Sequence, residues 1–366
     1  MPRISNIVDV ARMAGVSKST VSRVLNGQPH VKPATQEKIR AAIRELDFEP
    51  NPSARSIVLG STRTVGLLVP NLSSPFYVEI MEGIVSEISG HEYGLLLYKS
   101  EDKDEAFLKK VFLRGRTDGI IAITPRFREQ SFVEAFQGEQ PFVLINHRNT
   151  QIDAPYACFD NFGGGQEAAR YLLELGHTQV ACFAGRLASQ STRDRFEGFR
   201  KAFEEAGRPL AGEWVCVKGE HFEDSVAPIL QSWAARGRLP TAVFAYNDLT
   251  ALEVIAVLRE LGAPVPERVS VLGFDNIRMA RYSRPPLTTV SQAPELLGRS
   301  GARMLLKLVQ GRPLEQTRVT IAPQLIVRES CTKPTASPWA STSPASTPGH
   351  GVSPAGGDIH VPRRTV

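Results

Sequence analysis

A short segment near the beginning of the chain groups side chains that carry positive charge or donate hydrogen bonds. These side chains are Lys18, Ser19, Ser22 and Arg23. At helical spacing they share one face, because Val21, Val24 and Leu25 fall on the opposite face. Such donors can contact the phosphates of DNA and the acceptor atoms that base edges present in the major groove. The segment therefore predicts a helix that lies in the major groove of DNA.

The residues before this helix predict how it is positioned. Asn6 is a suitable N-cap for a first helix, Gly15 suits a tight turn with positive φ, and Ser17 caps the second helix. The first helix has one apolar face, formed by Ile7, Val10, Ala11 and Ala14. This arrangement is typical of a helix-turn-helix unit. A purely structural pair of helices would have the same periodicity, so the pattern alone leaves that alternative open.

A third amphipathic segment, from about Pro33 to Leu46, would complete a small helical head. Proline is tolerated in the first turn of a helix. The segment's apolar residues recur at helical spacing: Ile39, Ala42, Ile43 and Leu46. The three helices together predict a helical domain over residues 1–50.

Positive charge is concentrated at the two ends of the chain. Lys and Arg exceed Asp and Glu by four in residues 1–60 and by two from Cys331 onward, whereas residues 61–330 are close to neutral. A basic head on a neutral body is expected when only the head meets phosphates. An excess of four positive charges in residues 1–60 does not by itself exclude the alternative that the charge serves only solubility.

From Thr64 onward, apolar strand-like runs alternate with amphipathic helical segments. The predicted strands are TVGLLVP, GLLLYKS, DGIIAIT, PFVLIN, QVACFAG, TAVFAYN and VSVLGFD, and the predicted helices span 76–89, 164–175, 195–206, 249–261 and 296–309. Continuous apolar strands separated by helices indicate parallel sheets that are covered on both faces. Seven strands with their connecting helices are more than we expect in a single α/β domain. The predicted fold is therefore an all-α helix-turn-helix head followed by an α/β body of two lobes.

Polar residues follow many of these strands, where an interlobe cleft would bind a ligand. They are Asn71–Ser74, Asn146, Asp160, Asn161, Asn247, Asp248 and Asp275. Asp, Asn and Arg side chains that converge on one cleft suit a polyhydroxylated or heteroaromatic small molecule. Each residue taken singly is also explained as loop chemistry or a helix cap, and Asp248 in particular precedes a helix.

Several other classes of protein find little support in the sequence. No apolar run approaches eighteen residues and the first residues lack the apolar region of a signal peptide, so we expect a cytoplasmic protein. No Walker A, GxGxxG, HExxH or GxSxG motif occurs, and the four cysteines show no metal-binding spacing. We expect no enzymatic activity, cofactor or metal. A solute-binding protein of the periplasmic type, or a sugar-modifying α/β enzyme with a helical cap, remains as an alternative.

The composition changes at both boundaries of the predicted body. We expect a hinge and linker over residues 51–62, an effector-binding and dimerisation domain over residues 63–330, and a disordered tail over residues 331–366. The tail is rich in Pro, Ser and Thr and shows almost no apolar periodicity, so it cannot bury enough surface to offset its chain entropy.

Over about residues 4–330 the chain resembles the LacI/GalR family of bacterial transcription regulators. DVARMAGVSKSTVSRVLN resembles the helix-turn-helix signature of that family, and TAVFAYND, SVLGFDN and PPLTTV resemble the signatures of its ligand domain. The resemblance implies that Lys18, Ser19 and Arg23 read base edges. It also implies phosphate contacts, which would come from Ser17, Thr20, Ser22, Asn26 and His30.

The resemblance also implies a hinge helix that forms on DNA and inserts an apolar side chain into the minor groove. The matching position is Ile57, where many relatives have leucine, and Arg55 and Ser56 flank it. Ile is a poorer helix former than Leu but still an apolar wedge. We therefore expect the DNA to be kinked at the centre of its site.

In the body, the resemblance implies two lobes like those of periplasmic binding proteins, dimerised side by side. The positions that match the effector contacts are Ser74, Phe76, Asn146, Asp160, Arg195, Asn247 and Asp275. A sugar or sugar acid is the first expectation for the effector, and a purine or other metabolite is the second. The expected function is a homodimeric repressor that binds a pseudo-palindromic double-stranded DNA operator.

Overall fold

The structure is a computed structural model, and it describes residues 5–25, 29, 31–48, 60–99, 116–123, 140–147 and 154–335. Several positions of the sequence analysis lie outside these ranges. They are Asn26, His30, Arg55, Ser56, Ile57 and residues 336–366 of the tail.

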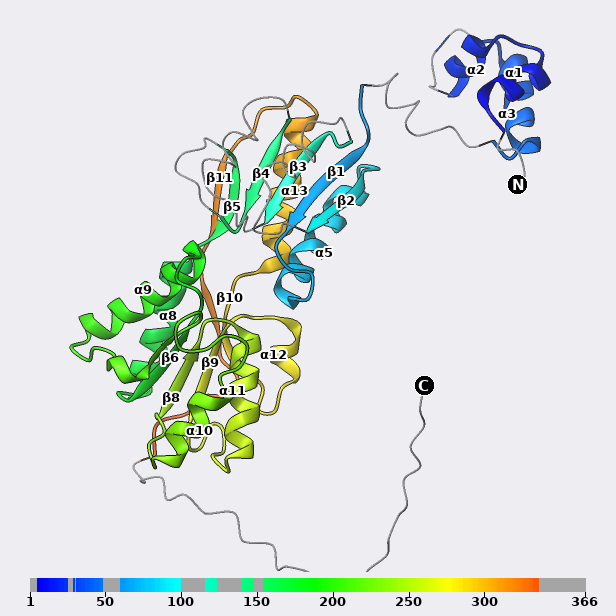
Figure 1. Cartoon of the computed structure of the whole chain (residues 1–366). Coiled ribbons are helices and arrows are strands. Elements are labelled where there is room, and N and C mark those ends of the chain that lie inside the picture. Colours follow the sequence, from blue (N-terminus) through cyan, green and yellow to red (C-terminus); the bar gives the residue numbers. More distant parts are fainter. Residues whose placement is uncertain are drawn as a thin grey trace, which may run out of the picture.

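The head consists of α1 (Ile7–Ala14), α2 (Lys18–Leu25) and α3 (Pro33–Glu45) (Figure 1). The predicted N-cap is confirmed, because Oδ1 of Asn6 accepts hydrogen bonds from the amides of Val8 and Asp9 at 2.8 and 3.3 Å. Gly15 ends α1 with a φ of 64°, as predicted for the turn. The three helices share a core formed by Val10, Ala11, Val21, Ile39, Ala42 and Phe48.

The first lobe of the body contains a six-stranded sheet in the order β11-β5-β4-β3-β1-β2. The strands are β1 (Thr64–Val69), β2 (Gly94–Lys99), β3 (Gly119–Ile123), β4 (Phe142–Ile145), β5 (Tyr156–Phe159) and β11 (Arg318–Ile321). All neighbours in this sheet pair in parallel. Two long helices pack together beside it, α5 (Pro75–Ser89) and α13 (Pro294–Val309) (Figure 1).

The second lobe contains a sheet of the same size in the order β12-β10-β9-β8-β6-β7. Its strands are β6 (Val180–Ala184), β7 (Val215–Val217), β8 (Ala242–Ala245), β9 (Ser270–Asp275), β10 (Thr288–Ser291) and β12 (Gln324–Ile326). Its helices are α8 (Asn161–Glu174), α9 (Gln190–Glu205), α10 (Ala227–Ala235), α11 (Asp248–Glu260) and α12 (Arg278–Tyr282), with a 3₁₀ turn at Gly212–Trp214. Strand β12 pairs antiparallel with β10, and the other described pairs of this sheet are parallel.

The chain passes between the lobes three times. It crosses from β5 to α8, from β10 to α13 and from β11 to β12. Side chains at the crossings therefore lie where the two lobes meet.

The predicted two-lobed α/β body is confirmed, together with all seven predicted strands, but some elements differ. Helices α8 and α9 begin at Asn161 and Gln190, several residues before the predicted starts. The short strands β5, β7, β10, β11 and β12 were not among the seven predicted strands, and the helices α10 and α12 were not predicted, because each is too short to show a clear period.

Residues 331–335, which belong to the segment predicted as a tail, are described by the structure and bond to the second lobe. The Cys331 thiol donates to the carbonyl oxygen of Val271, and the amide of Thr332 donates to the hydroxyl of Ser270 at 3.0 Å. These bonds attach residues 331–335 to the second lobe.

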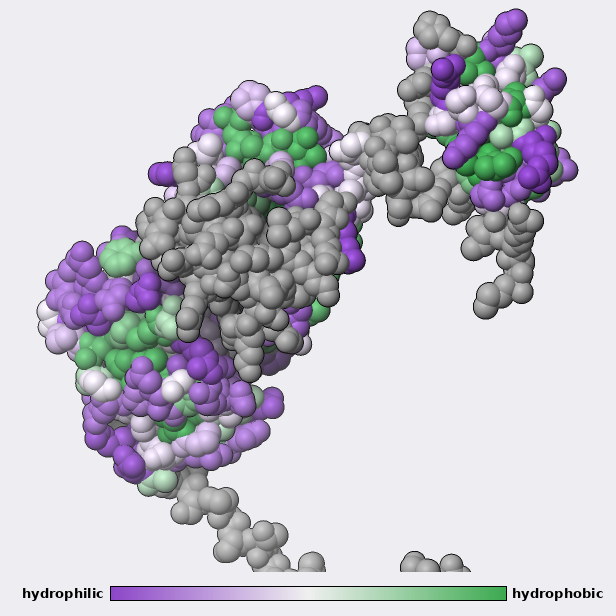
Figure 2. All heavy atoms as spheres, turned by 45° about the horizontal axis from the view of Figure 1, so that its top comes forward, coloured by the Kyte–Doolittle hydropathy of each residue, from purple (hydrophilic) through white to green (hydrophobic). Residues whose placement is uncertain are grey.

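Hydrophilic residues dominate the outer surface in the space-filling view, with smaller hydrophobic patches between them (Figure 2). In the part of the chain that the structure describes, no helix has both the length and the apolar character needed to cross a membrane.

Candidate functional site

The predicted DNA-reading residues lie on the outer face of α2. Lys18, Ser19 and Arg23 are exposed, while Thr20 and Ser22 are half-buried. Ser17 caps the helix as predicted, because its Oγ accepts a hydrogen bond from the Thr20 amide at 3.2 Å. The geometry leaves the two cationic side chains facing solvent while Val21 anchors the opposite face in the head core.

A buried ion pair between Arg195 and Asp275 is the centre of the polar site in the body. Nη1 of Arg195 lies 3.3 Å from Oδ1 of Asp275, and the two residues are only 5% and 6% exposed. Arg195 comes from the second turn of α9, and Asp275 ends β9. Both positions were predicted as effector contacts, and the fold brings them together.

Further contacts fix the guanidinium of Arg195. Its Nε donates to Oδ1 of Asn161 at 2.7 Å, and its Nη1 donates to the carbonyl oxygen of Tyr246 at 2.6 Å. Its Cζ lies 4.0 Å from the ring centroid of Phe274, a cation–π distance. The orientation of this cation is thus set by groups from α8, β9 and the residue after β8.

Burial changes the protonation chemistry of this pair. Burial raises the pKa of Asp275 to about 6, although Arg195 and Gln292 both favour its charged form. Burial likewise lowers the pKa of Arg195, an effect that Asp275 opposes. Perturbed groups of this kind are frequent at functional sites, because a protein keeps them buried only where their partners are well arranged.

The turn after β9 has an unusual backbone. Asp275 and Asn276 both have positive φ, at 117° and 58°, a conformation that costs non-glycine residues about 1–3 kcal/mol each. Three side chains hold the turn. Asp248 accepts from the Ile277 amide at 2.9 Å, Arg328 donates to Oδ1 of Asn276 at 2.7 Å, and Glu79 accepts from the Arg278 amide at 2.9 Å.

Glu79 belongs to the first lobe, so its bond to Arg278 crosses the boundary between the lobes. The carboxylate is 8% exposed, and burial raises its pKa. The Arg278 side chain adds exposed contacts with two carboxylates of the first lobe, Glu82 and Glu295. The same short turn therefore presents Asp275 to Arg195 and contacts the first lobe three residues later.

A small hollow lies between the lobes next to this ion pair. Its walls are Asn146, His147, Cys158 and Phe159 of the first lobe, and Asn161, Gln190, Ser191 and Asp194 of the second lobe. Its volume is about 10 Å³, room for a single water molecule. A ring-sized ligand therefore requires these described walls to move apart.

Among the remaining predicted effector residues, Asn146, Asp160 and Asn247 follow strands as expected, whereas Ser74 and Phe76 lie at the start of α5. Asn146 is buried and lines the hollow, whereas Asp160 and Asn247 cap α8 and α11 by accepting from Gly163 and Thr250, both at 2.9 Å. Ser74 precedes α5 without a capping hydrogen bond, and Phe76 is 6% exposed in the core of the first lobe. Ligand contact with the Phe76 ring is therefore limited to a small exposed part.

The alternative interpretation of Asp248 as a helix cap is wrong, because Asn247 is the cap. Asp248 is fully buried and accepts from the Thr289 hydroxyl at 2.6 Å. Burial raises its pKa well above the ordinary value, and the nearby Asp275 adds to this effect. Gln292 and Glu79 were also missed, because only long-range contacts bring them to the site.

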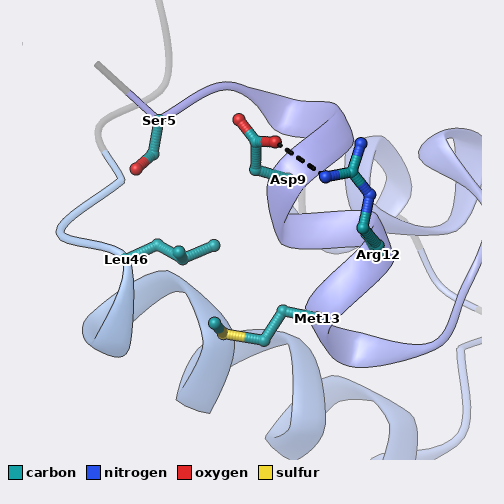
Figure 3. A pocket seen from close by; sticks show the side chains of 5 residues that line it. All are labelled: Ser5, Asp9, Arg12, Met13 and Leu46. Atoms are coloured by element: carbon teal, nitrogen blue, oxygen red, sulfur yellow. Dashed lines mark ion pairs between the residues drawn. The ribbon is translucent and has the colours of Figure 1, made fainter. Parts of the chain in front are cut away.

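A second, larger hollow of about 350 Å³ lies on the head between α1 and the end of α3 (Figure 3). It is lined by Ser5, Asp9, Arg12, Met13 and Leu46. Asp9 is already engaged by the N-cap amide of Asn6 and by an ion pair with Arg12 at 3.6 Å. This open surface has no buried charge to orient a ligand, so the interlobe site is the better candidate despite its smaller volume.

Within the described residues there is no group of three or more His, Cys, Asp or Glu side chains that could hold a metal ion. The side chains that line the hollow between the lobes offer hydrogen-bond donors and acceptors and the charge of Asp194.

Comparison with known proteins identifies the family. The model for bacterial regulatory proteins of the lacI family matches residues 6–51, and the model for a periplasmic binding protein-like domain matches residues 169–331. The HTH-type transcriptional repressor PurR of Vibrio vulnificus is 33% identical over 339 residues, which cover 90% of this chain and 99% of that protein. The chain belongs to the lacI family.

Other members agree with this assignment. PurR of Erwinia tasmaniensis is 34% identical to this lacI-family chain over 333 residues, covering 89% of it and 97% of the relative. The lac repressor dimer bound to operator and the anti-inducer ONPF matches with a TM-score of 0.78 and 27% identity, over 90% of this chain and 100% of that chain. The CelR–cellobiose complex matches with a TM-score of 0.65 and 31% identity, over 89% and 99%. The predicted class, a DNA-binding transcriptional repressor with an effector-binding body, is confirmed.

Proposed function

We propose that this lacI-family protein is a homodimeric repressor whose affinity for operator DNA is controlled by a small molecule bound between the lobes. The observation that carries the proposal is the buried Arg195–Asp275 ion pair beside a hollow with walls from both lobes. A ligand there contacts both lobes, so it can favour one lobe arrangement over another. By linkage, operator DNA must then change the affinity for the ligand by the same factor.

A sugar or sugar acid is the first candidate for the effector. The wall of the hollow is mainly polar and offers both donors and acceptors, from Asn161, Gln190, Ser191 and Asp194 among others. Fixed donors and acceptors of this kind suit a ligand with many hydroxyl groups. The solved relative CelR is described in complex with cellobiose.

A purine is the second candidate, and a separate observation favours it. The relatives with 33% and 34% identity carry the name PurR. We expect no enzymatic turnover of either ligand, and we expect the protein to act in the cytoplasm.

A thermal-shift screen of sugars, sugar acids and purines tests this proposal, because a specific ligand stabilises the folded protein by mass action. We expect one ligand class to raise the Tm of the wild-type chain and to leave Asp275→Ala unchanged. Arg278→Ala serves as the control, since its exposed side chain lies outside the hollow. An equal Tm rise in all three proteins would place the ligand elsewhere.

The base readers of the proposal are Lys18, Ser19 and Arg23, with phosphate contacts from Ser17, Thr20, Ser22, Asn26 and His30. Arg55, Ser56 and Ile57 form the hinge contact with the minor groove. We expect Arg23→Ala to weaken binding to a selected operator by about 1–3 kcal/mol and to relax its base preference. Arg44→Ala, an exposed position on α3 paired with Glu37, is the control in the same head. An unchanged base preference in Arg23→Ala would remove that residue from the reading face.

We propose that exposed apolar residues of both lobes form the dimer interface. These residues are Val78 and Val85 on α5, Leu249 on α11, and Met279 and Tyr282 on α12. Val78 and Val85 are seven residues apart and therefore share one helix face. Sedimentation of the wild type and of Tyr282→Asp tests the assignment, and a dimer that persists unchanged in the variant contradicts it.

A further inference from the structure

Asp118 holds the segment through which the chain enters the first lobe. The residue immediately precedes β3, and the segment Ser61–Arg63 immediately precedes the neighbouring strand β1. Both therefore lie at the amino-terminal edge of the same sheet. In the sequence, Ser61–Arg63 is the first part of the body after the residues that connect it to the head.

The carboxylate of Asp118 accepts four hydrogen bonds from these three consecutive residues. Its Oδ1 accepts from the amide and the hydroxyl of Thr62 at 2.5 and 2.7 Å. Its Oδ2 accepts from the hydroxyl of Ser61 at 2.5 Å and from the amide of Arg63 at 3.0 Å. A carboxylate has about four acceptor positions, so this segment occupies all of them.

Backbone hydrogen bonds and contacts of Arg63 also hold this part of the chain. The amide of Asp118 donates to the carbonyl oxygen of Thr64 at 2.8 Å, and the amide of Gly94 donates to the carbonyl oxygen of Arg63 at 2.8 Å. Arg63 has a φ of 51°, in the left-handed region, and its guanidinium lies 5.4 Å from the ring centroid of Tyr93. The side chain of Asp118 is thus the only one among the described residues that bonds to all three members of the segment.

We propose that Asp118 is a positioning residue for DNA binding, which fastens the chain leading to the head onto the first lobe. The inference rests on the proposed DNA-binding function. We call the Asp118 carboxylate and its hydrogen bonds to Ser61–Arg63 the anchor. With the anchor in place, these three residues move together with the first-lobe sheet. Without it, three residues are released, each able to span about 3.3–3.6 Å, so the head is less constrained relative to the body and to its partner copy.

This role predicts a selective defect. The Asp118 carboxylate bonds to Ser61, Thr62 and Arg63, none of which is a proposed DNA contact, so binding of a single head to phosphates is preserved. Binding of a specific operator requires two heads held at a fixed spacing, and the loss of the anchor weakens that binding. A carboxylate with a merely stabilising role in the first lobe would not separate these two kinds of binding.

The experiment uses the full-length protein and two duplexes, one selected from random DNA by the wild type and one with the selected bases scrambled. Fluorescence anisotropy gives Kd for Asp118→Ala, Asp118→Asn and Ser61→Ala. The matched control is Glu87→Ala, a first-lobe carboxylate in the last turn of α5 that accepts from Arg303 of α13 at 2.9 and 3.0 Å. Urea unfolding confirms that each variant is folded.

We expect Asp118→Ala to raise Kd for the selected duplex by about tenfold or more, the order expected for lost charged hydrogen bonds, with Kd for the scrambled duplex within about twofold of wild type. Asp118→Asn should fall between wild type and Asp118→Ala, because an amide keeps one acceptor and places a donor opposite the Arg63 amide. Ser61→Ala should have the smallest effect, and Glu87→Ala should match the wild type.

Equal weakening of both duplexes, an unchanged Kd in a folded Asp118→Ala protein, or the same loss in Glu87→Ala would each overturn the proposal. Amide hydrogen exchange at Thr62 and Arg63 gives a second reading that needs no DNA, and it should rise at least about tenfold in Asp118→Ala. If the wild type selects no duplex, the DNA-binding proposal fails. Amide hydrogen exchange at Thr62 and Arg63 then still tests whether Asp118 holds the segment. Unchanged exchange in Asp118→Ala would contradict that role.

Discussion

The two lobes each contain a pair of helices that meet at glycines, but the pairs place charges in different surroundings. In the first lobe, a Cβ on Gly83 of α5 would overlap the carbonyl oxygen of Glu295 on α13. In the second lobe, a Cβ on Gly165 of α8 would overlap the carbonyl oxygen of Arg195 on α9. In both pairs the close contact fixes the backbone of a residue whose charge reaches the lobe boundary.

The difference between the pairs lies in burial. Glu295 meets Arg278 at 3.1 Å on the surface, where both side chains are about half exposed or more, whereas Arg195 meets Asp275 where both are almost fully buried. Exposed ion pairs contribute little to stability, and removing one partner of a buried pair is costly. The same close packing of two helices thus positions a strong buried ion pair, Arg195–Asp275, in the second lobe and a weak exposed one, Glu295–Arg278, at the first lobe.

Removal of Arg195 should give the largest effect on stability. Arg195→Ala leaves Asp275 buried without its cation and removes the donors to Asn161 and Tyr246. We expect the free energy of unfolding at pH 7 to fall by about 3–5 kcal/mol, measured by urea titration with Trp214 and Trp233 of the second lobe as fluorophores. A loss below about 1 kcal/mol would show that the buried pair is no stronger than the exposed one.

The glycine contacts separate stability from ligand response. Gly83→Ala and Gly165→Ala should each lower the free energy of unfolding by about 1–3 kcal/mol, because the added methyl group pushes the paired helices apart. Circular dichroism during urea unfolding measures both losses. Only Gly165→Ala should also weaken ligand binding, since only there does the displaced backbone carry Arg195. Equal ligand affinity in both variants would contradict the claim that only the contact at Gly165 positions a ligand-binding residue.

The pH dependence of stability should report the burial of Asp275. Its folded pKa of about 6 lies above the ordinary value of 3.8, so between these values the folded state holds more protons than the unfolded state. Stability from this group therefore falls as pH rises through that window. We expect the stability difference between wild type and Asp275→Asn to change by about 2 kcal/mol between pH 4.5 and 6.5, in favour of the wild type at the lower pH. A difference independent of pH would contradict the raised pKa.

Removal of the exposed cation Arg278 should have the smallest effect on the free energy of unfolding. Arg278→Ala removes the contacts with Glu82 and Glu295 but keeps the amide that donates to Glu79. We expect a loss of less than about 1 kcal/mol, which high salt further reduces. A loss as large as that of Arg195→Ala would mean that exposure does not distinguish the two pairs.

Much of this architecture could be predicted from the sequence. Long apolar runs such as those of β1, β3 and β9 fix the sheet strands, and the caps at Asn6 and Ser17 fix the head, because these signals are local. The positions of Arg195 and Asp275 were also predicted, from their places in motifs that resemble a known family.

Other contacts could not be predicted because they depend on distant parts of the chain. Asn161 follows a strand, but its bond to Arg195 exists only because Gly165 lets α8 and α9 approach closely. Glu79 reads as an ordinary polar residue on α5 until the second lobe places the Arg278 amide against it. Asp118 likewise gains its role from three residues more than fifty positions away.

The most direct test of the account is the affinity for operator DNA with and without the ligand found by thermal shift, measured for the wild type and Arg195→Lys. Lysine keeps the charge but lacks the guanidinium fork that meets Asn161, Tyr246 and Asp275 together. The account predicts that the ligand changes the operator Kd of the wild type and leaves that of a folded Arg195→Lys protein unchanged. The same ligand-dependent change in both proteins would contradict the claim that this site controls DNA binding.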